Sequence, residues 1–197
     1  MVDGVGDNSD ESLGSPEKIV PIEKRTNRNK PADDDCWFRP ITSRDNIRQP
    51  EEGNGVYKLH HSAVARFDLP DAGIGQYKAE LSGRIRSRAG TIEQIVSNGE
   101  ALAKNRAEKS SSLNPSTKIE FVGVATSKVS EIRVWKFSNC DVVETSKGEG
   151  FGVEDDRAHA DLVLIDKNPA DVVHIKKEIA SALKVILPAK LCDDWFT

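Results

Sequence analysis

A helix near the C-terminus has both of its ends marked in the sequence. Asn168 is a favourable N-cap, Pro169 suits the first helical position, and Pro188 ends the segment because proline cannot continue a helix. Apolar residues recur between these ends at helical spacing: Val172, Ile175, Ile179, Leu183 and Ile186. The pattern predicts a helix that buries one face.

Strand-like segments precede this helix. Residues 56–60 and 76–88 alternate between apolar and polar side chains, the latter as one bent strand or two short ones. Residues 119–125 and 160–165 are continuous apolar runs, and the second of these is the most apolar, which is typical of a central strand. Residues 141–144 are a further strand candidate.

A second helix is predicted to follow Thr91. Thr91 and Gln94 have the spacing of a capping box, in which each side chain bonds the backbone amide of the other residue. Asn98 and Gly99 interrupt the apolar pattern, which predicts the end of a first helix there. A short helical turn is expected at residues 127–134.

Residues 1–35 differ in composition from the rest of the chain. They hold nine acidic and five basic residues, net −4, and few large apolar ones. Such a segment buries too little apolar surface to offset its ordering entropy, so we predict a disordered acidic tail. Residues 36–197 are then one α+β domain, with a mainly antiparallel or mixed sheet and two principal helices.

The charge of that domain is balanced. Of the 32 acidic and 28 basic residues in the chain, 23 of each lie in residues 36–197. A neutral body exerts no long-range attraction on nucleic acid or anionic lipid.

The cysteines and the apolar segments bear on the compartment. Cys36, Cys140 and Cys192 are odd in number and far apart, which argues against a disulfide framework and a cysteine zinc site. The N-terminus lacks the apolar core of a secretion signal, and no apolar stretch is long enough for a bilayer. We expect a cytoplasmic chain that needs no cofactor.

Standard catalytic and nucleotide-binding motifs are absent from the sequence. His159 and Asp161 are the best candidates for chemistry, because residues two apart on a strand share a face. A histidine beside a carboxylate can bind a metal or act as an acid–base pair. His60 and His61 are adjacent, so on a strand they point to opposite faces and only one of them could join that site. Alternatively, His159 only fixes the start of its strand.

Arg84, Arg86 and Arg88 alternate and would form one basic stripe on an extended strand. Such a stripe can meet phosphates, although no aromatic residue is interleaved to stack on bases. The alternative is a solvated edge strand whose charge prevents mispairing.

Residues suited to protein contacts lie in two places. Residues 146–157 form a glycine- and acid-rich loop that leads into an apolar strand, and binding residues often lie on such loops. Two adjacent aromatic residues lie close to the C-terminus. The candidate interaction residues are Glu154, Asp155, Asp156, Arg157, Trp195 and Phe196.

The run from Asp156 to Leu162, Asp-x-x-His-Ala-Asp-aliphatic before a helix, resembles a pattern found in small uncharacterised bacterial proteins. The resemblance covers the last third of the chain. It implies an association with defence or mobile-element gene clusters, but no activity and no residue role.

We therefore expect an accessory or protein-interaction domain without chemistry of its own. One alternative is a small hydrolytic enzyme that uses His159 and Asp161. Another is a nucleic-acid-binding module that uses the three arginines.

Overall fold

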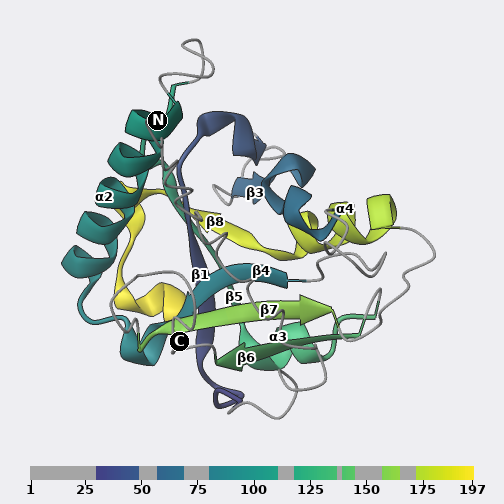
Figure 1. The fold of residues 1–197 in the computed structure, drawn as a ribbon. Helices are drawn as coiled ribbons and strands as arrows, with labels where there is room; N and C mark the ends of the chain where they lie inside the picture. Colours follow the sequence, from purple (N-terminus) through teal and green to yellow (C-terminus); the bar gives the residue numbers. More distant parts are fainter. Residues whose placement is uncertain are drawn as a thin grey trace, which may run out of the picture.

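The structure, a computed structural model, describes residues 30–48, 57–68, 80–110, 118–136, 139–144, 157–164 and 172–197. Within them lies one eight-stranded sheet in the order β2-β3-β8-β5-β1-β4-β7-β6, with all neighbours antiparallel (Figure 1). The strands are β1 (Cys36–Ile41), β2 (Ile47–Arg48), β3 (Tyr57–Leu59), β4 (Glu80–Ile85), β5 (Gly123–Lys128), β6 (Cys140–Glu144), β7 (His159–Leu164) and β8 (Lys184–Ile186).

Two helices in the described residues are long, as predicted. They are α2 (Ile92–Ser110) and α4 (Val172–Ala182), and α3 (Val129–Arg133) is a short one. The 3-10 turns are η1 (Arg44–Asn46), η2 (His61–Asp68), η3 (Arg86–Arg88), η4 (Pro188–Lys190) and η5 (Asp193–Phe196). The α+β class with an antiparallel sheet is confirmed. None of the described helices is both long and apolar enough to cross a bilayer.

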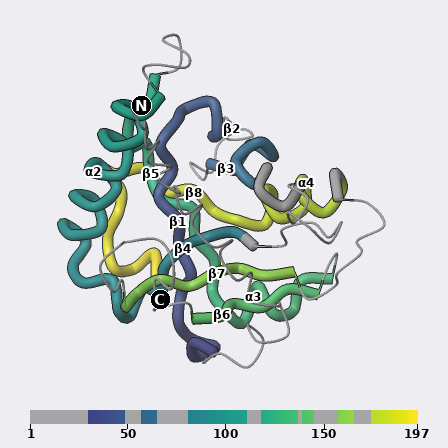
Figure 2. The backbone as a smooth tube through the Cα atoms, in the orientation of Figure 1, coloured from purple at the N-terminus to yellow at the C-terminus, as the bar shows by residue number. Residues whose placement is uncertain are grey.

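The sheet has a buried core on each face, because alternate residues of a strand point to opposite sides. Trp37 belongs to the larger core, which α3 and α4 cover, and we call this side the Trp37 face. Phe38 belongs to the smaller core, which α2 and the C-terminal segment cover, and we call this side the Phe38 face. Figure 2 shows α2 and the C-terminal segment, in teal and yellow, on one side of the sheet and α4 on the other.

Trp37 connects three strands. A Cβ atom at Gly83 on β4 would lie 2.3 Å from the indole, so only glycine leaves room for the ring there. The indole Nε1 donates a hydrogen bond to the carbonyl oxygen of Ala160 on β7, at 3.1 Å. These two contacts hold β4 and β7 against Trp37. They also determine which side chains of the two strands point to the opposite, Phe38 face.

The helix after Thr91 has the predicted start but not the predicted end. The Thr91 amide donates to Gln94 Oε1 at 2.8 Å and the Gln94 amide donates to Thr91 Oγ1 at 3.3 Å, which confirms the capping box. The prediction that Asn98 and Gly99 end the helix was wrong, because α2 continues to Ser110. Gly99 is buried instead, and a Cβ there would lie 2.4 Å from the Phe121 ring.

The last helix ends earlier than its apolar spacing predicted. It stops at Ala182, and Leu183 follows as a buried residue outside it. Lys184–Ile186 then form β8, which pairs with β3 and β5. Hydrogen bonding to β3 and β5 therefore decides the conformation of residues 184–186, although Leu183 and Ile186 continue the helical spacing. The predicted caps, Asn168 and Pro169, lie outside the described residues.

Three predicted strands differ in extent or place. Residues 80–85 of the expected strand 76–88 form β4, residues 86–88 form a 3-10 turn, and residues 76–79 lie outside the described part. The strand expected at 119–125 begins later, at Gly123. The most apolar run forms β7, but β7 is next to the edge strand β6 and is not central.

The last residues of the predicted tail contact the folded domain. Residues 1–29 lie outside the described residues, whereas Lys30 forms an ion pair with Asp141 at 2.5 Å. Asp33 pairs with Arg133, and Asp35 Oδ1 accepts from the Cys36 amide at 2.8 Å. Residues 30–35 therefore contact the folded domain, and the described residues begin before the predicted boundary at residue 36.

Candidate functional site

A row of polar side chains lies on the Phe38 face of β4 and β7. Arg84 is directly opposite His159, and Ser82 is directly opposite Asp161. The alternate residues of both strands, such as Leu81 and Leu162, lie in the core of the Trp37 face. The four polar residues therefore share one side of the sheet.

His159 and Asp161 lie close together, as their spacing predicted. His159 Nε2 is 4.0 Å from Asp161 Oδ1, so the two groups are near but not directly hydrogen-bonded. The Asp161 side chain is 9% exposed and the His159 side chain is 34% exposed. Within the described part of the chain, Asp161 Oδ1 is a buried oxygen without a hydrogen-bond partner. An unsatisfied buried carboxylate oxygen is energetically costly, so this oxygen marks a candidate site.

This pair does not gather further metal ligands among the described residues. No group of three His, Cys, Asp or Glu side chains there is arranged to hold a metal ion. His60 and His61 follow β3, and four strands lie between β3 and β7 in the sheet. The structure therefore does not bring either of them to His159 and Asp161.

The two adjacent histidines contact each other instead. The chain leaves β3 and enters η2 at this point, so the strand rule of opposite faces does not apply, and the ring centres are 4.1 Å apart. His60 Nδ1 is hydrogen-bonded to Ser62 Oγ at 2.7 Å. Desolvation and the positive charges of His60, Lys176, Lys177 and Arg48 lower the pKa of His61.

The arginine stripe does not form. Arg84 is on β4, but Arg86 and Arg88 are on the 3-10 turn η3, so the strand alternation that predicted one stripe ends at Ile85. Arg88 pairs with the buried carboxylate of Glu144 at 2.8 Å. Arg86 pairs with Asp193. Two of the three arginines thus hold parts of the domain together.

The C-terminal turn η5 separates the two predicted aromatic residues. Phe196 is 7% exposed and packs against Phe38, with ring centres 5.8 Å apart in an edge-to-face arrangement. Trp195 is 38% exposed. Phe196 is therefore part of the core and is not available to a partner, whereas Trp195 is. Of the other candidates, Arg157 is exposed, and Glu154, Asp155 and Asp156 lie outside the described residues.

Polar contacts on several sides fix this turn. Arg86 donates to the carbonyl oxygen of Gly90 at 2.7 Å, and its guanidinium lies 5.3 Å from the centre of the Phe196 ring. Cys36 Sγ donates to the Phe196 carbonyl oxygen at 3.3 Å. Burial, followed by the negative charge of Asp35, raises the pKa of the Cys36 thiol to about 11, so Cys36 is a structural thiol and not a nucleophile.

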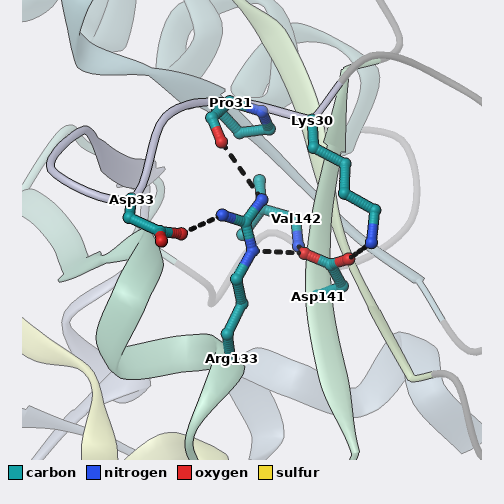
Figure 3. Close-up of polar contacts among 6 residues, drawn as sticks. All are labelled: Lys30, Pro31, Asp33, Arg133, Asp141 and Val142. Atoms are coloured by element: carbon teal, nitrogen blue, oxygen red, sulfur yellow. Dashed lines mark hydrogen bonds and ion pairs between the residues drawn. The ribbon is translucent and has the colours of Figure 1, made fainter.

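An ionic network that no sequence pattern indicated joins Lys30, Asp33, Arg133 and Asp141 (Figure 3). Arg133 donates to Asp141 Oδ1 at 2.8 Å and to the Pro31 carbonyl oxygen at 3.1 Å, and it also pairs with Asp33. Burial acts to raise the pKa of Asp141, but hydrogen bonds from Lys30 and Arg133 outweigh it and hold that pKa below its usual value. Asp141 Oδ1 also accepts from the Val142 amide at 2.8 Å.

This network is structural. It attaches residues 30–33 beside β6, the edge strand of the sheet, and its carboxylates and cations bind one another. Contacts of this kind cover an edge that would otherwise pair with another chain. The sequence shows the acidic residues before Cys36 and the basic Arg133. It does not show that Asp33 and Arg133 pair, so the network could not be predicted.

Comparison with known proteins adds no relative. No family model, no curated protein and no solved structure matched the chain. The resemblance to small bacterial proteins remains a prediction.

Proposed function

We propose that this chain is a protein-binding domain and that its partner contacts the C-terminal turn η5 at Trp195. The observation that carries the proposal is the contrast between neighbours on one turn: Phe196 is buried in the core while Trp195 is 38% exposed. Tryptophan is, with tyrosine and arginine, enriched among the few residues that dominate binding energy at protein interfaces.

The turn is held before any partner arrives. Phe38 packs on Phe196, Cys36 bonds its carbonyl oxygen, and Arg86 pairs with Asp193. A side chain presented from a fixed backbone loses less conformational entropy on binding than one on a mobile segment. This rigidity supports Trp195 as an anchor residue.

The charges beside Trp195 indicate the chemistry of the partner. Asp194 is exposed, and the side chain of Asp193 is 73% exposed although it pairs with Arg86. A partner surface that fits would hold an apolar pocket for the indole with basic groups at its rim. Such a contact weakens with added salt, because rim charges are screened.

A second candidate function is chemistry at His159 and Asp161, and the unpartnered Oδ1 of Asp161 favours it. A hydrolytic site would use the histidine as the base and the carboxylate to orient it. Nucleic-acid binding through Arg84, Arg86 and Arg88 has less support, because Arg86 and Arg88 are engaged in ion pairs within the domain.

The proposal is tested by quantitative affinity capture from the native host with three proteins: the wild type, Trp195→Ala and Val134→Ala. Val134 is 73% exposed at the end of α3 and serves as a matched control for loss of exposed apolar surface. We expect at least one protein that the wild type and Val134→Ala capture and that Trp195→Ala loses. Capture profiles that are the same for all three proteins would refute the assignment to η5.

A further inference from the structure

Three carboxylates of β6 and β7 are buried, and one of them lacks a hydrogen-bonded cation. The three belong to Asp141, Glu144 and Asp161. Arg133 donates to Asp141 at 2.8 Å, and Arg88 donates to Glu144 at the same distance. Asp161 differs, since within the described part of the chain its buried Oδ1 atom accepts no hydrogen bond. Such a carboxylate is costly, because burial removes the water that would otherwise bond it.

The side chains beside Asp161 on the sheet do not supply the missing donor. The Nε2 atom of His159 is 4.0 Å from Oδ1, which is beyond hydrogen-bond range. Arg84 is directly opposite His159, and both residues have interactions of their own. On the other side, Asp161 is directly opposite Val143 of β6, whose side chain is apolar. Among the described residues, the carboxylate therefore has a charged neighbour but no donor at bonding distance from Oδ1.

The hydroxyl of Ser82 lies on the same face as this carboxylate. Ser82 of β4 is directly opposite Asp161, and residues paired in this way have Cβ atoms about 5 Å apart. Exposure rises across these polar residues: the Asp161 side chain is 9% exposed, Ser82 is half-buried, and the His159 side chain is 34% exposed. Of the three, the carboxylate is thus the most buried group and the imidazole is the one that solvent reaches most easily.

We propose that Asp161 and Ser82 bind the ammonium group of a small organic amine. An ammonium group donates three hydrogen bonds, and the carboxylate and the hydroxyl supply acceptors for it. It also brings the positive charge that Arg133 and Arg88 provide to the other two buried carboxylates. A metal ion fits less well, because the described residues hold no group of three His, Cys, Asp or Glu side chains for it. This site does not depend on a partner at Trp195.

The test is a titration of the full chain with n-propylammonium at constant ionic strength, followed by NMR of the His159 ring proton Hε1. This ring reports on the site because its Nε2 atom is 4.0 Å from Asp161 Oδ1. Two further probes separate the properties of the ligand: n-propanol has a donor without a charge, and tetramethylammonium has a charge without an N–H donor. We expect a saturable shift with n-propylammonium and at least about tenfold weaker binding of both other probes.

Three variants complete the design. Asp161→Asn removes the charge at nearly constant shape and should abolish the saturable shift. Ser82→Ala should weaken binding about fivefold, the effect of one hydrogen bond. Asp194→Asn removes an exposed carboxylate on η5 and should bind within about twofold of the wild type. Without amine, Asp161→Asn should melt at the wild-type temperature or above it, because a buried charge is removed, so its loss of binding is not due to unfolding.

Three results would overturn the proposal. The first is no saturable shift of the wild-type His159 ring with n-propylammonium up to about 50 mM. The second is equal affinity of Asp161→Asn for this probe, or of the wild type for n-propanol, since the carboxylate would then not be the binding group. The third is a melting temperature of Asp161→Asn several degrees below the wild type without amine, which would show that the fold itself already satisfies this carboxylate.

Discussion

The guanidinium of Arg86 lies over the ring of Phe196, with Cζ 5.3 Å from the ring centre. The same guanidinium pairs with Asp193, 107 residues further along the chain. Both contacts join the turn after β4 to the C-terminal turn η5. The exposed position of Trp195 is thus determined by contacts that its neighbours make on either side.

Phe196→Ala should destabilise the domain by about 3–5 kcal/mol, because it removes a buried aromatic ring from the core on the Phe38 face. Trp195→Ala should cost less than about 1 kcal/mol, since its side chain is partly exposed. Urea denaturation of both variants checks this pair. Equal losses would mean that the turn packs differently from the structure described above.

Gly99→Ala should destabilise the domain although alanine is a better helix former than glycine. A Cβ at this position would lie 2.4 Å from the Phe121 ring, and overpacking typically costs about 1–3 kcal/mol. Ser97→Ala, at an exposed position of α2, is the control and should be neutral or slightly stabilising. Phe121→Leu should recover part of the loss in Gly99→Ala, and failure of this rescue would speak against the contact.

Local signals in the sequence predicted local structure well. Thr91 and Gln94 marked the start of α2, because a capping box involves residues only three apart. The alternation at His159 and Asp161 placed both on one face. Features set by distant neighbours cannot be read from local patterns: Asn98 and Gly99 predict a helix end, whereas Gly99 lies inside α2 against the Phe121 ring. Residues 184–186 continue a helical pattern but pair with β3 and β5.

In the candidate site, too, local features were predictable and features set by distant residues were not. The arginine alternation suggested a stripe, but the strand ends at Ile85 and Arg86 turns toward the C-terminal segment. The neighbourhood of Arg48, Lys58 and Lys184 could not be predicted either, because these residues meet only through strand pairings that join distant parts of the chain.

Asp141→Asn should lower stability at neutral pH by about 2 kcal/mol, because hydrogen bonds to a charged group are lost. The folded protein holds the pKa of Asp141 below its ordinary value of 3.8, so the charged form is the one that folding favours. The contribution is fully present above that value and is lost as pH falls through the lower folded pKa. The difference in unfolding free energy between wild type and Asp141→Asn should therefore be constant above pH 5 and shrink at lower pH.

Asp194→Asn is the control for that experiment, because Asp194 is exposed. Its stability should match the wild type at every pH. A difference between wild type and Asp141→Asn that grows as the solution is acidified would contradict the assignment.

Isothermal titration calorimetry with zinc or manganese should show no stoichiometric binding that depends on His159. The two groups at this position, His159 and Asp161, supply only two ligands, and the described residues add no third. His159→Ala should change local order alone. Stoichiometric metal binding that His159→Ala removes would replace the interaction proposal with the enzyme candidate.

The proposed binding of a partner at Trp195 predicts a specific pattern of affinities. Once capture identifies the partner, its Kd should be measured for the wild type, Trp195→Ala and Val134→Ala at 50 and 300 mM salt. An anchor residue contributes about 2 kcal/mol or more, so Trp195→Ala should raise the Kd at least about 30-fold, and the wild-type Kd should rise with salt. Val134→Ala should stay within about threefold of the wild type. A Trp195→Ala Kd within threefold of the wild type would show that Trp195 is not an anchor residue for this partner.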